Sequence, residues 1–316
     1  MKRVFLLAAA LLFAAPSFAQ FPNKPVRIVV PFPAGSATDT ITRILGQSVS
    51  AAVGQPVVVD NKVGADGAIA GAEVAKAAPD GYTLLMATNS PMAAVPAMKK
   101  QQPYDPVADF TPITDIGRYT FFLYVNAGVP VRSFQELVSY AKANPGKLNY
   151  ATGNTTGIVS FAQMNSLAGI DMTHVPYKGE PQGITDLVGG RVQLMWATPT
   201  TGLAHVKDGK LRAIATNLKG RSSLLPEVPT MAEVGIPQYS VVSWAALYGP
   251  AKLPREVLAR LHKEFTDAMK RPEVIAAMDK QAFSMSPGTS DELGAFTKSQ
   301  MEAYRTILRA AGVQPE

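Results

Sequence analysis

Residues 26–40 read VRIVVPFPAGSATDT and decide the fold class of this chain. The apolar, β-branched run before Pro31 has the length and composition of a buried strand, and a tight turn around Gly35 follows it. Apolar residues then recur at helical spacing after Thr40, and Gly54 offers a C-terminal stop. The turn therefore lies at the carboxyl end of a strand and at the amino end of a helix.

This turn has two interpretations. Unpaired N–H groups and the positive end of the helix dipole meet there, so the loop can bind an anion with few charged side chains. Alternatively, Ser36 or Thr38 is an ordinary helix cap that satisfies the free donors. This stretch alone leaves both interpretations open.

A second stretch repeats the same logic further along the chain. Residues 148–157 read LNYATGNTTG, which predicts a strand, a small polar loop and the start of a helix. Strands predicted at residues 26–30, 57–60 and 82–86 alternate with helical patterns, which indicates a parallel α/β sheet. Two such loops in two α/β units predict two half-sites that face each other across a cleft.

The N-terminus has the pattern of a secretory signal peptide over residues 1–19. It combines the basic pair Lys2-Arg3, an apolar run from Val4 to Ala15, and a small-x-small cleavage site at residues 17–19. A membrane anchor is the alternative, but the apolar run is shorter than a span needs. Without residues 1–19, the 30 Lys and Arg residues fall to 28 against 24 acidic residues, a formal net charge of +4. This mild excess, without basic runs, argues against nucleic acid as a partner.

Composition also argues against metal, cofactor and nucleophile chemistry. The chain has no Cys, and His174, His205 and His262 lie far apart in sequence, so neither a thiolate nor a zinc spacing is present. The Gly-rich residues 64–71 match neither a dinucleotide fingerprint nor a phosphate loop, and are expected to enter a helix packed on a sheet. No Gly-x-Ser-x-Gly elbow occurs. We expect no metal and no cofactor.

Several motifs in a fixed order resemble a known family. They are PFPAGSATD at residues 31–39, AAPDGYTL at 77–84, VPYKG at 175–179, LPEVPT at 225–230 and the segment around Trp244. In these stretches the chain resembles the periplasmic solute-binding proteins of the tripartite tricarboxylate transporter type, the Bug family. The resemblance covers nearly the whole chain after the signal peptide.

The resemblance implies an α/β fold of two domains joined by two crossing strands, which close on a small carboxylate like a hinged trap. It places residues 20–122 and 242–316 in domain 1 and residues 123–241 in domain 2. The crossing strands are expected near Phe121–Val125 and Ser240–Tyr248. The implied partners are the ligand and a cognate membrane permease, and we expect a periplasmic monomer without stable membrane insertion.

The ligand-binding residues expected from the two helix starts and from the family's binding loops share a position at the ends of strands. They are Phe32, Ala34, Gly35, Ser36, Ala37, Thr38, Asp39, Asn89, Ser90, Gly153, Asn154, Thr155, Thr156, Tyr177 and Thr198. Backbone N–H groups and hydroxyls would hold the anion. Asp39 would repel a carboxylate, but Arg43 lies four residues on and can pair with it along the helix.

Three functions are weighed. The first is carboxylate binding for uptake. The second is an exported enzyme similar to a hydrolase, which the absence of a nucleophile elbow disfavours. The third is a ligand sensor for a signalling receptor, which the sequence does not separate from transport.

The expected ligand has two carboxylates, aliphatic or aromatic, or one carboxylate and a neutral polar end. The family pattern often carries an Asp just after the strand that ends at Trp196, but Ala197 and Thr198 stand there in this chain. An ammonium group buried without a partner is costly, so amino acids are disfavoured. Two helix starts offer two anion sites, one in each domain. The aromatic ring of Phe32, Tyr177 or Trp196 could lie against a flat ligand.

Overall fold

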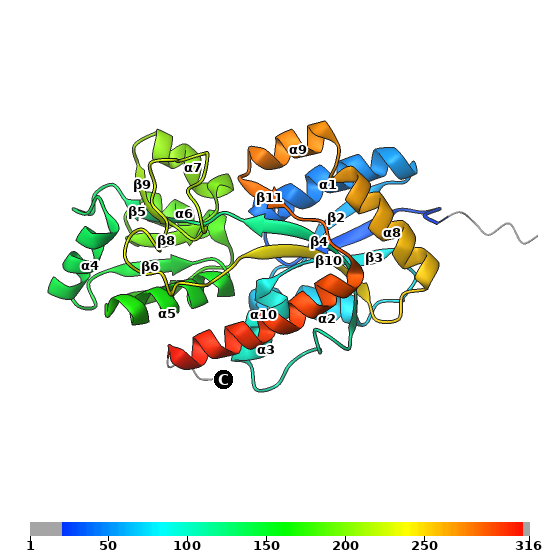
Figure 1. Ribbon diagram of the computed structural model, residues 1–316, viewed down its shortest axis with the longest axis horizontal. Helices are drawn as coiled ribbons and strands as arrows, with labels where there is room; N and C mark the ends of the chain where they lie inside the picture. Colours follow the sequence, from blue (N-terminus) through cyan, green and yellow to red (C-terminus); the bar gives the residue numbers. More distant parts are fainter. Residues whose placement is uncertain (1–20, 312–316) are drawn as a thin grey trace, which may run out of the picture.

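The computed structural model describes residues 21–311 and contains two β-sheets. The first lobe is built on a six-stranded sheet of order β11-β4-β10-β3-β1-β2, and the second lobe on a five-stranded sheet of order β7-β6-β8-β5-β9 (Figure 1). The predicted signal peptide, residues 1–19, lies outside the described residues.

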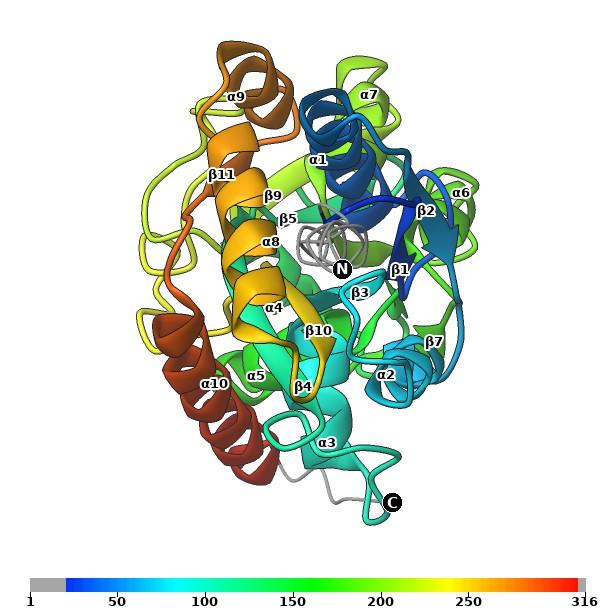
Figure 2. The ribbon, with the colours of Figure 1, turned by 90° about the vertical axis from the view of Figure 1, so that its right-hand side faces the viewer.

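The strands of the first lobe are β1 (Val26–Val30), β2 (Val57–Asn61), β3 (Thr83–Thr88), β4 (Phe110–Tyr119), β10 (Trp244–Pro250) and β11 (Phe283–Met285). The strands β1, β2 and β3 are parallel, as the alternation of strand and helix patterns predicts. Residues 28–30 of β1 have no exposed surface, because helices cover both faces of this sheet (Figure 2). The helices are α1 (Ala37–Val53), α2 (Ala68–Ala75), α3 (Val95–Met98), α8 (Arg255–Ala268), α9 (Pro272–Asp279) and α10 (Ser290–Ala310).

The second lobe repeats this architecture on a smaller scale. Its strands are β5 (Phe122–Asn126), β6 (Asn149–Thr152), β7 (Thr173–Pro176), β8 (Leu194–Ala197) and β9 (Leu211–Thr216). Its helices are α4 (Phe134–Ala143), α5 (Thr155–Ala168), α6 (Glu180–Val188) and α7 (Pro199–Lys207). The strands β6, β7 and β8 run parallel, whereas β5 lies antiparallel to β8 and β9. The helices α5, α6 and α7 therefore all begin at the carboxyl ends of strands.

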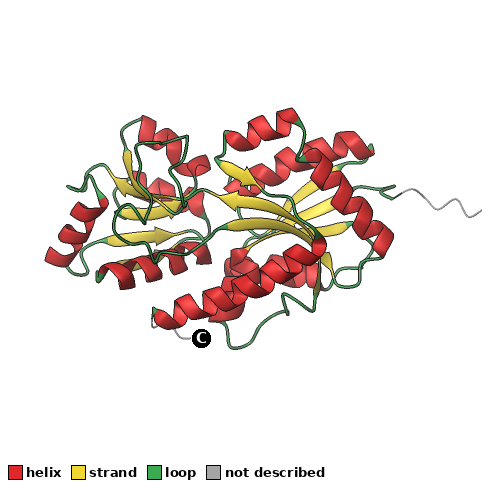
Figure 3. Cartoon of the chain, viewed as in Figure 1, coloured by secondary structure: helices red, strands yellow, loops and turns green. Residues whose placement is uncertain are grey.

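The chain passes between the lobes twice. Thr120 and Phe121 connect β4 to β5, and residues 217–243 lead from β9 back to β10. The strands β4 and β10 pair antiparallel and run side by side towards the second lobe (Figure 3). The α/β fold with two lobes is the predicted fold class, and the exact domain boundaries stay a prediction.

The strand β4 is a long element that the sequence pattern did not predict. Pro112, Asp115 and Gly117 interrupt its apolar alternation, and its register with β10 shifts twice. The short edge strand β11 was not predicted either. Both elements extend the first sheet beyond β10, and the last residue of β4, Tyr119, reaches the cleft described below.

The C-terminal helix α10 contacts both lobes. Figure 1 shows it running from beneath the first sheet towards α5. Tyr304, Ile307 and Leu308 of α10 share a hydrophobic cluster with Val159 of α5. The lobes are thus held together on this side by apolar packing as well as by the chain crossings. Between residues 21 and 311, the structure contains no helix with both the length and the apolar character of a membrane span.

Candidate functional site

A cleft lies where the two lobes meet, at the carboxyl ends of β1, β3, β6 and β8. Residues of both lobes line it: Phe32, Ser36, Ala37, Thr38, Thr88, Asn89, Tyr119, Phe121, Gly153, Asn154, Thr156, Glu180, Thr198 and Ser243. Nine of the fifteen predicted ligand-binding residues are among these fourteen. The cleft therefore lies where the two predicted half-sites meet.

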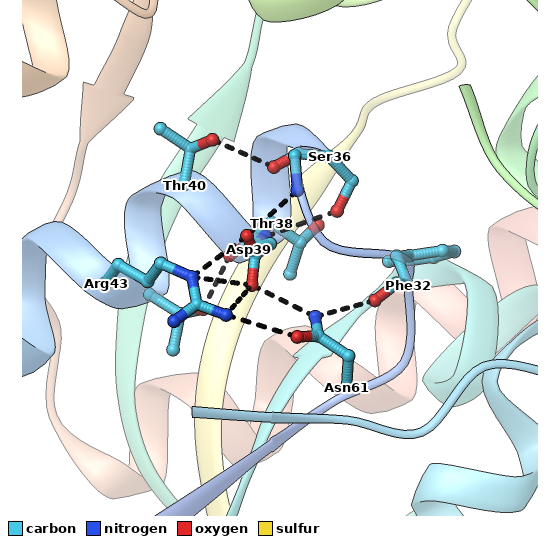
Figure 4. Close-up of polar contacts among 9 residues, drawn as sticks. Phe32, Ser36, Thr38, Asp39, Thr40, Arg43 and Asn61 are labelled. Atoms are coloured by element: carbon cyan, nitrogen blue, oxygen red, sulfur yellow. Dashed lines mark hydrogen bonds and ion pairs between the residues drawn. The ribbon is translucent and has the colours of Figure 1, made fainter. Parts of the chain in front are cut away.

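The turn before α1 is braced by Asp39 rather than open (Figure 4). The Asp39 carboxylate accepts the Gly35 N–H at 3.0 Å and both its oxygens accept the Arg43 Nε–H at 3.0 Å. Asn61 donates to the same carboxylate and to the Phe32 carbonyl. Burial opposes ionisation of Asp39, but the hydrogen bonds from Arg43, Gly35 and Asn61 together hold its pKa below the ordinary value. The predicted Asp39–Arg43 pair is confirmed, and the carboxylate is not part of the cleft lining.

The start of α1 keeps hydrogen-bond donors available to the cleft. The Ser36 Oγ caps the helix by accepting the Asp39 N–H at 3.3 Å. Among residues 21–311, no group accepts the N–H of Ala37 or of Thr38. The Thr38 hydroxyl accepts from the Tyr119 hydroxyl at 2.9 Å and keeps its own hydrogen for another acceptor. Capping and anion binding are therefore compatible here, because the cap uses one amide and leaves two.

Two of the predicted ligand contacts join the lobes instead of lining the cleft. The Ser90 hydroxyl donates to Thr155 Oγ1 at 2.8 Å and accepts the Thr155 N–H at 3.0 Å. Beside them, the Asn89 amide nitrogen hydrogen-bonds the hydroxyls of Thr156 and Tyr304. These contacts connect the end of β3 to the start of α5 and consume donors that the sequence assigned to a ligand.

The wall of the second lobe carries a carboxyl group that the sequence analysis missed. Glu180 is the first residue of α6, is only 6% exposed and lines the cleft. Its Oε2 accepts the Thr198 N–H at 3.1 Å, the Thr198 hydroxyl at 2.7 Å and the Thr201 hydroxyl at 3.1 Å. Burial raises the pKa of Glu180 above its ordinary value, against the lowering effect of the hydrogen bonds from Thr198 and Thr201. The expectation that no carboxyl group faces this end of the ligand is wrong.

Gly153 makes this wall possible by a close approach. A Cβ built on Gly153 would lie 2.4 Å from the Glu180 nitrogen, so no larger residue fits without a backbone shift. The predicted loop at residues 153–157 thus packs against the start of α6. The sequence does contain a signal for Glu180. It is an acidic residue between Gly179 and Pro181, shortly after β7, where α6 begins.

The remaining predicted residues lie around the cleft. The Tyr177 hydroxyl donates to Asp186 at 2.8 Å, and Tyr177 lines an adjoining outer pocket together with Lys178. This pocket shares Phe32 and Gly153 with the cleft. Ala34 and Gly35 belong to the turn but not to the lining. Trp196 is buried and stacks on Tyr239, so it packs in the core. Phe32 is the only one of the three aromatic candidates in the lining.

Metal binding finds no support in the described part of the chain, where no group of three or more His, Cys, Asp or Glu side chains could hold an ion. The polar groups of the cleft are instead amides, hydroxyls and one carboxyl group. Such a lining suits a small organic ligand held by hydrogen bonds.

Comparison with known proteins gives a consistent result. Residues 41–313 match the Tripartite tricarboxylate transporter family receptor, TctC. Protein BugT of Bordetella pertussis is 31% identical over 98% of this chain and 96% of its own length. The structure of R. palustris Rpa4515 with adipate superposes with a TM-score of 0.90 at 30% identity, covering 94% of this chain and all of that one.

A further solved structure, MatC of Rhodopseudomonas palustris with bound malate, gives a TM-score of 0.86 at 27% identity over 91% of this chain and all of its own. The match to the receptor family extends over most of the chain and spans both lobes. The resemblance found in the motifs is therefore confirmed, and this chain belongs to the tripartite tricarboxylate transporter receptor family, whose members include the Bug proteins.

Proposed function

We propose that this protein captures a small carboxylate in the cleft between its lobes and delivers it to a membrane transporter in the periplasm. The observation that carries the proposal is the start of α1, where Ala37 and Thr38 line the cleft and their amides have no acceptor in the described chain. Adipate and malate, carried by Rpa4515 and MatC, are both carboxylates and support this ligand class. The family consists of solute-binding receptors, so the prediction that the chain is not an enzyme holds and the exported hydrolase is set aside.

The donors at the start of α1 are sufficient for useful affinity. Each hydrogen bond to a charged group contributes roughly 1.5–3 kcal/mol. A micromolar dissociation constant needs about 8 kcal/mol in total. The two amides, the Thr38 hydroxyl and apolar contact with Phe32 can together supply this, and the positive end of the α1 dipole adds to it.

We assign the predicted binding residues two roles. Those in the lining surround the ligand: Phe32, Ser36, Ala37, Thr38, Asn89, Gly153, Asn154, Thr156 and Thr198. Among them, Thr198 acts through Glu180, to which its amide and hydroxyl donate. Ser90 and Thr155 hold the lobes together once they have closed, while Ala34, Gly35 and Asp39 shape the turn. Tyr177 belongs to the outer pocket.

A dicarboxylate, aliphatic or aromatic, remains the proposed ligand, with a condition set by Glu180. A second ionised carboxylate at the wall of the second lobe would lie near the Glu180 carboxyl group, so it needs a hydrogen between the two. Delivery to a permease is preferred over sensing because the matched family is a transporter receptor family.

The test is a ligand screen on protein unfolded, dialysed and refolded to remove any bound ligand. Succinate, malate, glutarate, adipate and the phthalate isomers are tested by thermal shift and then by calorimetry, each beside the matched monocarboxylate and the matched amine. At least one carboxylate should raise the melting temperature and bind in the micromolar range or tighter. Failure of every carboxylate in the panel, or equal binding of an uncharged amide, would refute the proposal.

A further inference from the structure

The Glu180 carboxyl group occupies the place in the second lobe where an anion would be expected. The helices α5, α6 and α7 begin at Thr155, Glu180 and Pro199, and the starts of α6 and α7 meet around this side chain. The Thr198 amide and the hydroxyls of Thr198 and Thr201, which a free anion could have used, all donate to it. The second anion site is therefore filled by the chain's own acid.

The two oxygens of Glu180 differ in how they are used. Oε2 accepts the three hydrogen bonds from Thr198 and Thr201, which lie between 2.7 and 3.1 Å. Oε1 has one long contact, from the Asn154 amide at 3.4 Å. Glu180 and Asn154 both line the cleft, so Oε1 is the atom with capacity left for a ligand.

No positively charged side chain in the described part of the chain pairs with Glu180. Among residues 21–311, no Lys, Arg or His nitrogen lies within 4.0 Å of its oxygens. The titratable groups that act on it from β4 and β5 are the phenols of Tyr119 and Tyr124, whose pKa values are raised by burial and by the Glu180 charge. Asp186 on α6 is engaged by Tyr177 and Arg191.

Around the same lobe, His174 on β7 hydrogen-bonds the Thr152 hydroxyl. Lys178, in the loop before α6, is exposed. On the facing wall, Asp39 is bound by Arg43. The described surroundings therefore contain no cationic side chain that would offset two negative charges placed side by side at Glu180.

We propose that Glu180 determines ligand specificity through one shared hydrogen. The group that the ligand presents to the second lobe must share a single hydrogen with Glu180 Oε1. A hydroxyl, amide or ammonium group brings that hydrogen and binds the ionised acid. A second carboxylate binds only when one proton is taken up with it. This inference rests on the proposed carboxylate function and names what the other end of the ligand has to be.

Burial favours the neutral form of Glu180 and raises its pKa, so the surroundings of this side chain act in the direction of proton uptake. The direction of the pH dependence of binding follows from proton linkage. A complex that holds one more proton than the free protein and ligand is favoured as the pH falls, by up to about tenfold in affinity per pH unit.

The experiment compares each dicarboxylate with its monoamide: succinate with succinamate, glutarate with glutaramate and adipate with adipamate. Calorimetry from about pH 5.5 to about pH 8.5, in buffers of different ionisation enthalpy, measures affinity and protons taken up together. For the native protein we expect dicarboxylate binding to take up close to one proton and to weaken as the pH rises. Monoamide binding should take up none and change little.

The variant E180Q carries a permanent donor of the same shape. In E180Q, dicarboxylate binding should lose its pH dependence and exceed that of the native protein at the alkaline end of the range, because the amide keeps its hydrogens at every pH. E227Q is the matched control, because Glu227 is exposed in a loop. It should behave as the native protein does.

The outcomes separate the two proposals. A dicarboxylate that binds without proton uptake, with equal affinity for the native protein and E180Q, overturns the inference and leaves the proposed function standing. Failure of every dicarboxylate and monoamide to bind overturns both. The buffer comparison on the native protein needs no variant, so it decides the question even if E180Q does not fold.

Discussion

Replacing Thr38 by Val removes one hydroxyl from the cleft and keeps the shape of the side chain. Thr38 is 5% exposed at the start of α1, and its hydroxyl accepts from Tyr119 while its own hydrogen can reach a ligand anion. We expect Thr38→Val to weaken carboxylate binding, because the anion loses a charge-assisted hydrogen bond. The neighbouring amides of Ala37 and Thr38 remain, so binding should be reduced and not abolished.

The expected magnitude has two parts. Loss of the hydrogen bond to the anion costs roughly 1.5–3 kcal/mol, which is about a 10- to 150-fold increase in the dissociation constant. The buried Tyr119 hydroxyl also loses its acceptor, which lowers the free energy of unfolding by about 1–3 kcal/mol. Calorimetry with the carboxylate that gives the largest shift in the screen measures the first part, and urea unfolding measures the second.

Two controls isolate the ligand contact. Tyr119→Phe breaks the same side-chain pair but leaves the Thr38 hydroxyl in the cleft, so it should bind the ligand more tightly than Thr38→Val does. Lys178→Met removes an exposed charge in the outer pocket and should bind within a factor of about two of the native protein. Normal binding by Thr38→Val together with lost binding by Lys178→Met would refute the site assignment.

Three further perturbations follow from the geometry. Asp39→Asn should lower the melting temperature at neutral pH, because the pKa of Asp39 is lowered in the folded protein. The stability that the ionised Asp39 contributes is present above about pH 4 and is lost as the pH falls through the folded pKa. The melting temperatures of the native protein and the variant should therefore converge in acid. Ser90→Ala and Thr155→Val each remove a hydrogen bond between the lobes and should weaken ligand binding. Solution scattering should give both variants a larger radius of gyration than the native protein when no ligand is bound. An unchanged radius and an unchanged affinity would argue against a role of this contact in closure. Gly153→Ala should lower both stability and affinity, since its Cβ meets the start of α6, and native-like urea unfolding would contradict this.

The parallel cores of the lobes were predictable because local pattern and tertiary position agree there. Strands β1, β3 and β8 are apolar runs of strand length, buried on both faces, and each ends at a turn that starts a helix. The start of α1 was predicted with its cap and its Asp39–Arg43 brace, because these contacts span at most four residues. Short-range contacts of this kind are readable from spacing alone.

The strand β4 was not readable in this way. Its Pro112, Asp115 and Gly117 disfavour a strand locally, yet pairing with β10 on one side and β11 on the other supplies the hydrogen bonds that hold it. The turn at Thr230 shows the opposite case. Thr230 and Glu233 have the spacing of a capping box and form its two reciprocal hydrogen bonds. No helix follows, because Gly235 and Pro237 interrupt it.

Within the site, spacing identified the donors but not their partners. Ser90 and Thr155 are hydroxyl residues at the ends of strands, as predicted, and each is satisfied by the other across the lobes. Their separation along the chain is 65 residues, so no local pattern could show that they meet. A hydroxyl at a helix start thus indicates a hydrogen bond there and does not by itself indicate a ligand.

Glu180 shows where the prediction of ligand class failed. The sequence argument searched for an acid directly after β8 and found Ala197 and Thr198 instead. The structure brings the acid from another element, the first residue of α6, and places its Oε2 on the Thr198 amide and hydroxyl. A carboxyl group can therefore reach the end of β8 from a helix that begins 18 residues earlier. What a ligand meets in a cleft depends on which elements converge there, so the count of charges has to be made over the whole lining and not strand by strand.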